Sequence, residues 1–299
     1  MIYEVIIIGG GPAGLSAAVY AARYKINFAI VAPMWGGFVN EAHSVENWLG
    51  DKSISGQDLV NRFLDHVKSL KSPMITANVQ AIEKTKSGFE IITHDNRYKA
   101  KKVILALGTE RNKLGINGEE EFLGKGVSYC ATCDGFFFRD KTVAVVGSGD
   151  AACTGATFLS DVAKKVYLIY RSPSLKAEPI WIDKVNTTDN IECLPDTRLK
   201  EIAGKDKVEK IVFEDNTELA VDGVFIEVGS TPTNFITQRL GLEVDNKGYI
   251  AVDSDQKTSI EGIYAAGDIT TNSSKFKQII VAASEGAVAV YNAYIDLKK

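Results

Sequence analysis

Two cysteines, Cys130 and Cys133, stand close together in the stretch SYCATCDGFFF. A pair with this spacing can contribute to a metal site, form a structural disulfide, or act as a dithiol that is oxidised and reduced in turn. Two intervening residues at the start of a helix bring the sulfurs into bonding range, and the helix dipole favours the reactive thiolate. The pair is therefore a candidate redox site.

The other cysteines and the histidines offer little support for a metal site. A structural zinc ion needs four ligands, commonly supplied as two closely spaced pairs. Cys153 and Cys193 are isolated in the sequence, and His43, His66 and His94 all lie far upstream of the cysteine pair. We therefore expect no metal, and we interpret Cys153 and Cys193 as packing residues.

The composition sets the class of protein and of substrate. The chain has 299 residues, of which 45% are hydrophobic and 24% are charged, enough for two globular domains. The net charge of -4 argues against a nucleic acid or an anionic membrane as partner. The apolar stretch Val5–Ile8 lacks the flanks of a signal peptide, so we expect a cytoplasmic protein that acts on a small molecule or another protein.

A glycine loop near the start of the chain has the spacing of a dinucleotide-binding turn. The segment GGGPAG follows an apolar strand and precedes a helical pattern, with Gly9, Gly11 and Gly14 in GxGxxG register. Gly9 permits the tight turn, Gly11 leaves room for a pyrophosphate, and Gly14 lets helix and strand pack closely. The helix N-terminus then offers free N–H groups to the phosphates.

The same pattern recurs after Lys141, with Gly147, Gly149 and Ala152 in GxGxxA register. Short alternating strands follow each loop, and each series ends in an apolar strand that stops at a glycine, Gly108 or Gly229. The sequence thus predicts an α/β fold of two Rossmann-type dinucleotide-binding domains, each with a β-meander insertion.

The last part of the chain is too short for a separate core, so we expect it to complete the first domain, which is then discontinuous. The predicted domains are residues 1–112 with 236–299, and residues 113–235, which carry the cysteine pair. The chain would cross between them near Arg111–Gly118 and near Gly229–Asn234, where Gly, Pro and Asn suit hinges.

Two dinucleotide folds and a cysteine pair together suggest an electron path. A nicotinamide delivers two electrons as hydride, a flavin accepts them, and the flavin can pass them on to a disulfide. The motifs GGGPAG, GGFVNEAHSVENWLG, SYCATCDGFF, GSGDAA and TSIEGIYAAGDIT together resemble the low-molecular-weight thioredoxin reductases, a family of FAD-dependent pyridine nucleotide-disulfide oxidoreductases. The resemblance covers essentially the whole chain.

The resemblance implies FAD in the first domain and NAD(P)H in the second. The residues it implies for FAD are Gly9, Gly11, Pro12, Ala13, Gly14, Trp35, Gly36, Gly37, Phe38, Asn47, Val79, Gly108, Gly267, Asp268, Lys277 and Gln278. Those it implies for the nicotinamide cofactor are Gly147, Ser148, Gly149, Asp150, Ala151, Arg171, Ser172 and Lys176. Asp268 would hold a ribityl hydroxyl of the FAD.

Catalytic roles also follow from the resemblance. Cys133 would face the flavin, Cys130 would attack the disulfide of thioredoxin or a thioredoxin-like protein, and Asp134 would act as general acid–base. One geometry cannot serve both the flavin and a bulky partner, so we expect the domains to rotate against each other, as in the family. A homodimer is likewise expected from the family.

The nicotinamide specificity departs from the family pattern. The family's NADPH form usually carries two adjacent arginines and a third a few residues on, clustered on the 2′-phosphate. Here Arg171 is retained, Ser172 replaces the second arginine, and Lys176 stands in for the third. We expect NADPH to be accepted, with reduced discrimination against NADH.

Two other functions compete with the reductase. One is an NAD(P)H oxidase or an electron-transfer flavoprotein with a different reductant or acceptor, in which the cysteines take no part. The other is a non-catalytic nucleotide sensor, which would leave Cys130, Cys133 and Asp134 without a purpose.

Overall fold

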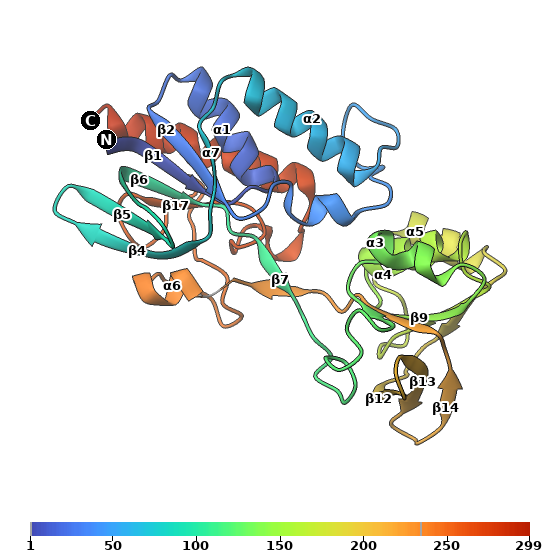
Figure 1. Cartoon of the computed structure of the whole chain (residues 1–299). Coiled ribbons are helices and arrows are strands. Elements are labelled where there is room, and N and C mark those ends of the chain that lie inside the picture. The colour runs from blue at the N-terminus through green and yellow to red at the C-terminus, as the bar shows by residue number, and fades with distance from the viewer. Residues whose placement is uncertain (1, 234) are drawn as a thin grey trace. The chain divides into compact units, whose positions relative to one another are not determined.

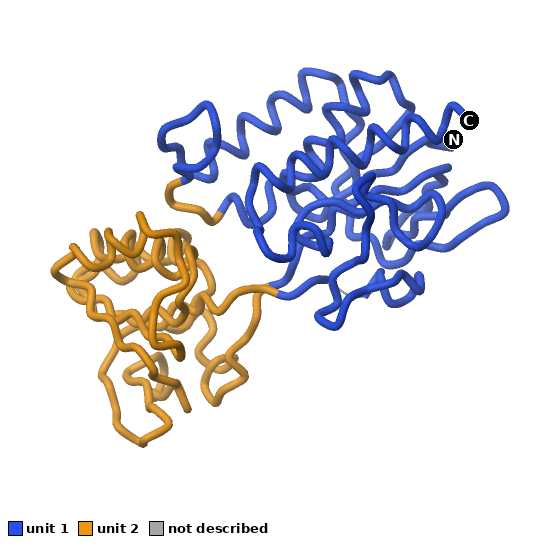
Figure 2. Tube along the Cα trace, turned by 180° about the vertical axis from the view of Figure 1, so that it is seen from behind, with its two compact units in different colours: residues 1–40, 45–110, 231–299 blue, residues 41–44, 111–230 orange. Residues whose placement is uncertain are grey.

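The computed structural model describes residues 2–233 and 235–299 (Figure 1). Met1 and Asn234, at the end of the predicted second crossing, lie outside the described residues. The chain divides into two compact units (Figure 2). Unit 1 comprises Met1–Asn40, Val45–Glu110 and Thr231–Lys299, and unit 2 comprises Glu41–Ser44 and Arg111–Ser230.

Unit 1 is built on a seven-stranded sheet of order β3-β2-β1-β6-β5-β4, in which β17 also pairs with β6. Its parallel strands are β1 (Ile2–Ile8), β2 (Phe28–Ala32), β3 (Met74–Thr76), β17 (Ile263–Ala265) and β6 (Arg97–Leu105). β6 pairs with β1 from Lys99 to Leu105 and with β17 from Val103 to Leu105. The first half of β6 pairs antiparallel with β5 (Gly88–Thr93), which pairs with β4 (Val79–Thr85). The predicted first meander therefore continues the parallel sheet through one long strand.

Three longer helices belong to unit 1: α1 (Pro12–Arg23), α2 (Gly56–Ser69) and α7 (Ile279–Leu297). Short turns of helix complete it, namely η1 (Gly37–Glu41), α6 (Phe235–Leu240) and η3 (Ser273–Lys275). Ser55 caps α2, because its Oγ accepts a hydrogen bond from the N–H of Asp58 at 3.1 Å.

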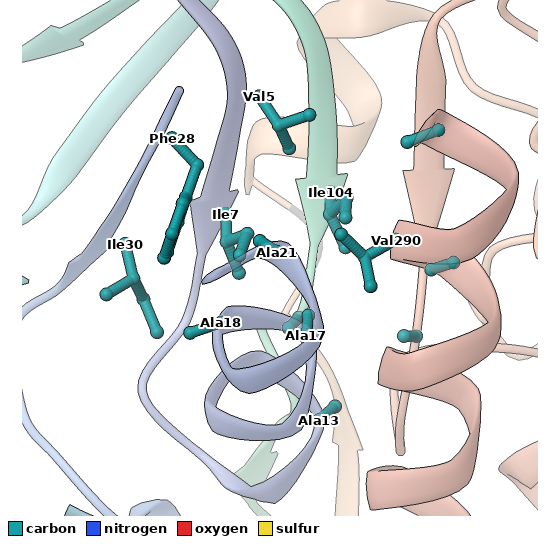
Figure 3. Packing of buried hydrophobic residues seen from close by; sticks show 14 of the residues in the cluster. Val5, Ile7, Ala13, Ala17, Ala18, Ala21, Phe28, Ile30, Ile104 and Val290 are labelled. Carbon is teal, nitrogen blue, oxygen red and sulfur yellow. The ribbon is translucent and has the colours of Figure 1, made fainter. Parts of the chain in front are cut away.

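The core of unit 1 packs α1 against α7. Alanines on one face of α1 pack under Ile7 and Phe28 of the sheet, and Val290 of α7 closes the same cluster (Figure 3). A Cβ on Gly286 would lie 2.0 Å from the carbonyl oxygen of Ala13, so only glycine allows this approach of α7 to α1. The close packing fixes the glycine loop relative to the middle of α7.

Unit 2 contains a parallel five-stranded sheet of order β11-β10-β9-β15-β8. The strands are β8 (Val127–Ser128), β9 (Thr142–Val146), β10 (Lys165–Ile169), β11 (Ile191–Leu194) and β15 (Gly223–Ile226). Helices α4 (Asp150–Ser160) and α5 (Pro179–Asn186) belong to the same unit. The second meander, β12 (Leu199–Gly204), β13 (Val208–Phe213) and β14 (Glu218–Ala220), forms a separate antiparallel sheet.

The two crossings between the units pair with each other as β7 (Thr109–Arg111) and β16 (Ser230–Pro232). Within unit 2, Arg111 forms ion pairs with Glu41 and with Glu227, the latter at 2.5 Å. Burial raises the pKa of Glu227, and the guanidinium of Arg111 opposes that rise. Residues 41–44, which the sequence prediction includes in the first domain, thus cluster with unit 2, where the ring of His43 packs 4.4 Å from that of Phe158.

Candidate redox and cofactor sites

Cys130 and Cys133 form a disulfide, with their Cα atoms 5.3 Å apart. Cys130 precedes α3 (Ala131–Asp134) as its N-cap, and its Sγ accepts a hydrogen bond from the N–H of Cys133 at 3.2 Å. The predicted helix is thus only one turn long, continued by the 3-10 turn η2 (Gly135–Phe138), so it offers little macrodipole. The N–H of Cys133 is a local donor that would stabilise negative charge on the sulfur of Cys130 once the disulfide is reduced.

Asp134 is held in place by a serine that the sequence prediction missed. Ser128, only 4% exposed, donates a hydrogen bond from its Oγ to Oδ2 of Asp134 at 2.6 Å. The Oγ of Ser128 also accepts a hydrogen bond from the N–H of Cys130 at 3.0 Å. One hydroxyl therefore connects the carboxylate of Asp134 to the main chain of the first cysteine.

The sequence prediction also missed a contact made by Tyr129, the residue before Cys130. Tyr129 donates its hydroxyl proton to Oε1 of Glu119 at 2.6 Å, and Glu119 is 1% exposed. The Glu119 carboxylate also accepts the N–H groups of Leu114 and Gly115, just after the first crossing. Burial and this carboxylate together raise the pKa of Tyr129. In the sequence, Glu119 is one of three consecutive glutamates, and nothing there distinguishes it from its neighbours.

The first glycine loop has the geometry of a phosphate cradle. Gly9 has a φ of +124°, and a Cβ there would lie 1.9 Å from the carbonyl oxygen of Ala106. A Cβ on Gly14 would lie 1.9 Å from the carbonyl oxygen of Gly9, whereas one on Gly11 would meet no atom within 4 Å. Gly11 is the N-cap of α1 and provides no side-chain cap, so open space lies above backbone N–H groups. These residues fit a pyrophosphate.

The loop between β2 and α2 is tied to this cradle. The N–H of Gly36 donates to the carbonyl oxygen of Gly10 at 2.7 Å, and Asn40 donates its Nδ2–H to the carbonyl oxygen of Trp35 at 2.7 Å. The indole N–H of Trp35 donates to Thr76 at 3.1 Å. Gly37 lies within this loop as the first residue of η1. The loop is therefore ordered beside the first glycine turn.

Two residues far apart in the sequence meet at the start of α7. Asn47 donates its Nδ2–H to Oε1 of Gln278 at 3.0 Å, and Gln278 is the N-cap of α7. Lys277, its neighbour, lies with its Nζ 5.0 Å from the centre of the Tyr249 ring. The structure thus brings together three of the residues implied for FAD.

Asp268 follows Gly267 in the turn after β17. Burial raises the pKa of Asp268 to about 6, Lys277 lowers it, and the nearby charge of Glu285 raises it further. A carboxylate whose pKa is raised by burial in this way is typical of a ligand-binding site.

The remaining residues implied for FAD have mixed surroundings. Pro12 is the first residue of α1, and Ala13 is buried in the α1–α7 core. Phe38 is exposed, and Gly108 has a φ of +66° with open space around it. Val79 is buried in a second apolar cluster of unit 1, so only its main chain is available to a ligand.

The second glycine loop repeats the first in unit 2. Gly147 has a φ of +151°, and a Cβ there would lie 2.2 Å from the carbonyl oxygen of Glu227. Gly149 is the N-cap of α4 without a side-chain cap, and its surroundings are open within 4 Å. Ser148 lies between these glycines, and Asp150 and Ala151 begin α4. This loop also fits a pyrophosphate.

The segment after β10 is anchored to this loop. The N–H of Lys176 donates to the carbonyl oxygen of Ser148 at 2.7 Å, and the N–H of Glu178 donates to Oδ1 of Asp150 at 2.7 Å. The side chains of Arg171 and Lys176 are exposed beside it. Ser172 donates its only hydroxyl proton to the carbonyl oxygen of Ser174 at 2.8 Å, so a phosphate would have to displace that bond.

The two free cysteines have the properties of unreactive thiols. Burial raises the pKa of Cys153 to about 12 and also raises that of Cys193. Both sulfurs therefore stay protonated at neutral pH. Among residues 2–233 and 235–299, no group of three or more His, Cys, Asp or Glu side chains is arranged to hold a metal ion. No helix within these ranges is both long and apolar enough to span a membrane.

Comparison with known proteins gives the family. Residues 3–286 match the family model described as pyridine nucleotide-disulphide oxidoreductase, and the chain belongs to this family. It is 40% identical over 303 residues to a thioredoxin reductase of Treponema pallidum, a match that covers 98% of this chain and 97% of the relative.

Solved structures agree with this result. The chain is similar to the thioredoxin reductase of T. acidophilum, with a TM-score of 0.94, 39% identity, and coverage of 100% of this chain and 99% of the other. It is also similar to the thioredoxin reductase of Lactococcus lactis, with a TM-score of 0.95, 34% identity, and coverage of 99% of both chains. These similarities confirm the predicted resemblance and the predicted fold class.

Proposed function

We propose that this protein is an NADPH-dependent flavoprotein that reduces the disulfide of thioredoxin or a thioredoxin-like protein. The family and the thioredoxin reductase relatives confirm the enzyme class, a disulfide reductase that uses a flavin and a pyridine nucleotide. The observation that carries the proposal is the Cys130–Cys133 disulfide, held next to Ser128 and Asp134 in a chain with two open glycine loops.

FAD is the flavin that fits unit 1. The first glycine loop would receive its pyrophosphate, and Asp268 would accept a hydrogen bond from the ribityl chain. When bound, the flavin accepts hydride from a nicotinamide and passes the electrons to a disulfide. The second glycine loop, with Arg171 and Lys176 beside it, would hold the nicotinamide cofactor.

The chain's own part of the reaction is thiol–disulfide exchange. After reduction, the Cys130 thiolate attacks one sulfur of the partner's disulfide, which forms a mixed disulfide and releases the partner's other sulfur as a thiolate. The Cys133 thiolate then attacks the sulfur of Cys130, which restores the internal disulfide and releases the partner as a dithiol. Both electrons have then passed to the partner, and both of its sulfurs take up protons.

Two local groups support this exchange. In the disulfide the N–H of Cys133 donates to the sulfur of Cys130, and after reduction the same N–H would stabilise the attacking thiolate. Asp134, whose carboxylate accepts a hydrogen bond from Ser128, would transfer protons to and from the sulfurs, as the resemblance implies. A homodimer remains a proposal that rests on the resemblance alone.

Replacing the attacking sulfur tests the proposal. In the Cys130→Ser variant we expect reduction of oxidised thioredoxin to fall to background, because the mixed disulfide cannot form. The reduction of bound flavin by NADPH should persist, and oxygen consumption should persist or rise. Stopped-flow absorbance of the flavin and a thioredoxin-coupled assay measure these steps separately.

The matched control is Cys153→Ser, which replaces a buried and unreactive thiol. It should leave both steps close to the wild-type rates. Thioredoxin reduction by Cys130→Ser at the wild-type rate would contradict the proposal. A wild-type protein whose flavin is reduced but which leaves oxidised thioredoxin unreduced would favour the alternative function, an NAD(P)H oxidase or electron-transfer flavoprotein in which the cysteines take no part.

A further inference from the structure

A buried carboxylate in unit 1 takes no part in the proposed electron path. Glu285 lies in α7 and is only 6% exposed. Its Oε2 accepts hydrogen bonds from the N–H of Gly267 at 2.8 Å and from the hydroxyl of Thr270 at 2.9 Å. Its Oε1 accepts a hydrogen bond from the hydroxyl of Ser273 at 2.8 Å. A charge at this depth is stable only because such donors surround it.

All three donors come from one short segment, residues 266–273, which we call the AGD turn after its first three residues, Ala266-Gly267-Asp268. Gly267 has a φ of +82°, a conformation that needs external support to be the only one populated. Inside the turn, the N–H of Thr270 donates to the carbonyl oxygen of Gly267 at 2.9 Å, and the N–H of Ser273 donates to the hydroxyl of Thr270 at 3.2 Å. Glu285 thus binds both ends of the turn at once.

The direction of Asp268 depends on this arrangement. Asp268 is bonded directly to Gly267, whose N–H is held by the carboxylate of Glu285. Helix α7, which carries Glu285, is itself pressed against the first glycine loop through Gly286 and Ala13. The carboxylate therefore ties the AGD turn to the same framework that holds the phosphate cradle.

We propose that Glu285 is a positioning residue for FAD, whose buried carboxylate holds the AGD turn in the one conformation that presents Asp268 to the ribityl chain. This inference rests on the proposed function, in which unit 1 binds FAD. It assigns a role to a buried side chain that sequence motifs do not single out.

The same carboxylate also acts on the charge of Asp268. Two charged side chains influence the carboxyl group of Asp268 besides its burial: Lys277 lowers its pKa and Glu285 raises it. The ionised form is the better acceptor for a ribityl hydroxyl, so FAD affinity should fall as the pH drops through about 6. Without the charge of Glu285, the pKa of Asp268 falls and this transition moves to lower pH.

The test is the FAD dissociation constant of the full-length holoenzyme, measured from the fluorescence of released flavin across the acidic and neutral pH range. For Glu285→Gln we expect the dissociation constant at neutral pH to rise about 10- to 100-fold, because at least one charge-assisted hydrogen bond is lost. We also expect the pH of half-maximal affinity to lie below that of the wild type. General loosening of the fold would not move that midpoint downwards.

Two further variants keep the test decisive. Ser273→Ala removes a single donor and should raise the dissociation constant by about threefold to tenfold, even where Glu285→Gln folds poorly. Glu83→Gln neutralises an exposed glutamate of the same unit and should leave affinity and midpoint unchanged.

Wild-type affinity and midpoint in Glu285→Gln, or wild-type affinity in Ser273→Ala when Glu285→Gln does not fold, would overturn this inference alone. A wild-type protein that takes up no flavin would overturn the proposed function as well.

Discussion

Ser128 shows how one hydroxyl organises a redox segment. It donates to the carboxylate of Asp134 and accepts from the N–H of Cys130, so one side chain connects the proposed general acid to the proposed nucleophile. Side-chain oxygens placed between two functional groups in this way fix geometry that the backbone alone leaves free. We therefore assign Ser128 a positioning role in the exchange step.

For Ser128→Ala, we expect the exchange of the reduced dithiol with a protein disulfide to slow by about tenfold, because Asp134 loses its donor. Reduction of the flavin by NADPH should be unaffected. Rapid mixing of the prereduced protein with oxidised thioredoxin measures the first rate, and Ser128→Thr, which keeps the hydroxyl, should recover most of it. Ser160→Ala, which removes a hydroxyl bonded only within α4, is the control. Exchange at the wild-type rate in Ser128→Ala would refute the assignment.

At the residue scale, the sequence predicted the residues that have a recognisable spacing and missed those whose partners are defined only by the fold. Cys130, Cys133, Asp134 and the glycines have spacings that carry information along the chain. Glu119 and Glu285 acquire their roles only from neighbours that folding brings to them, the latter from a turn well before it in the sequence. A sequence pattern does not distinguish a glutamate that will be buried and bonded from one that will be exposed.

At the scale of elements, periodicity identified most strands, but not how they join. The short strands after the first glycine loop are not all separate from the apolar strand that ends the series. YKA and KKVIL form the single strand β6, because β1 pairs with both stretches, from Lys99 to Leu105. The helix at the cysteine pair is shorter than the sequence predicts, because Gly135 leads the chain into a 3-10 turn. In the sheet, tertiary pairing decides what local pattern cannot.

The segment after β10 gives a prediction at the same scale. Its main chain is fixed to the second glycine loop, and its Ser172 hydroxyl is bonded within the segment. An arginine at position 172 would add a positive charge to a segment whose main chain is already fixed, where it could pair with the 2′-phosphate that only NADPH carries. Ser172→Arg should therefore raise the ratio of kcat/KM for NADPH over NADH by about 10- to 100-fold. Steady-state kinetics with both cofactors measures it.

Ser172→Ala provides the control, and its ratio should stay within about threefold of the wild type because the hydroxyl is already engaged. An unchanged ratio in Ser172→Arg would show that the 2′-phosphate binds elsewhere.

At the scale of the whole molecule, the repeated glycine loop was enough to predict an α/β fold with two dinucleotide-binding units. The meanders were predicted as equivalent, yet the first extends the main sheet and the second stands as its own sheet. Nor did the sequence indicate that residues 41–44 would cluster with unit 2, since the ion pair of Glu41 with Arg111 joins positions far apart in the chain.

The central claim is that this chain stores electrons both on a flavin and on the Cys130–Cys133 pair. Anaerobic titration of the yellow protein with NADPH, followed by flavin absorbance, tests it most directly. The wild type should consume about two equivalents before reduction is complete, and Cys130→Ser about one, because each carrier takes two electrons. About one equivalent for both proteins would contradict the account.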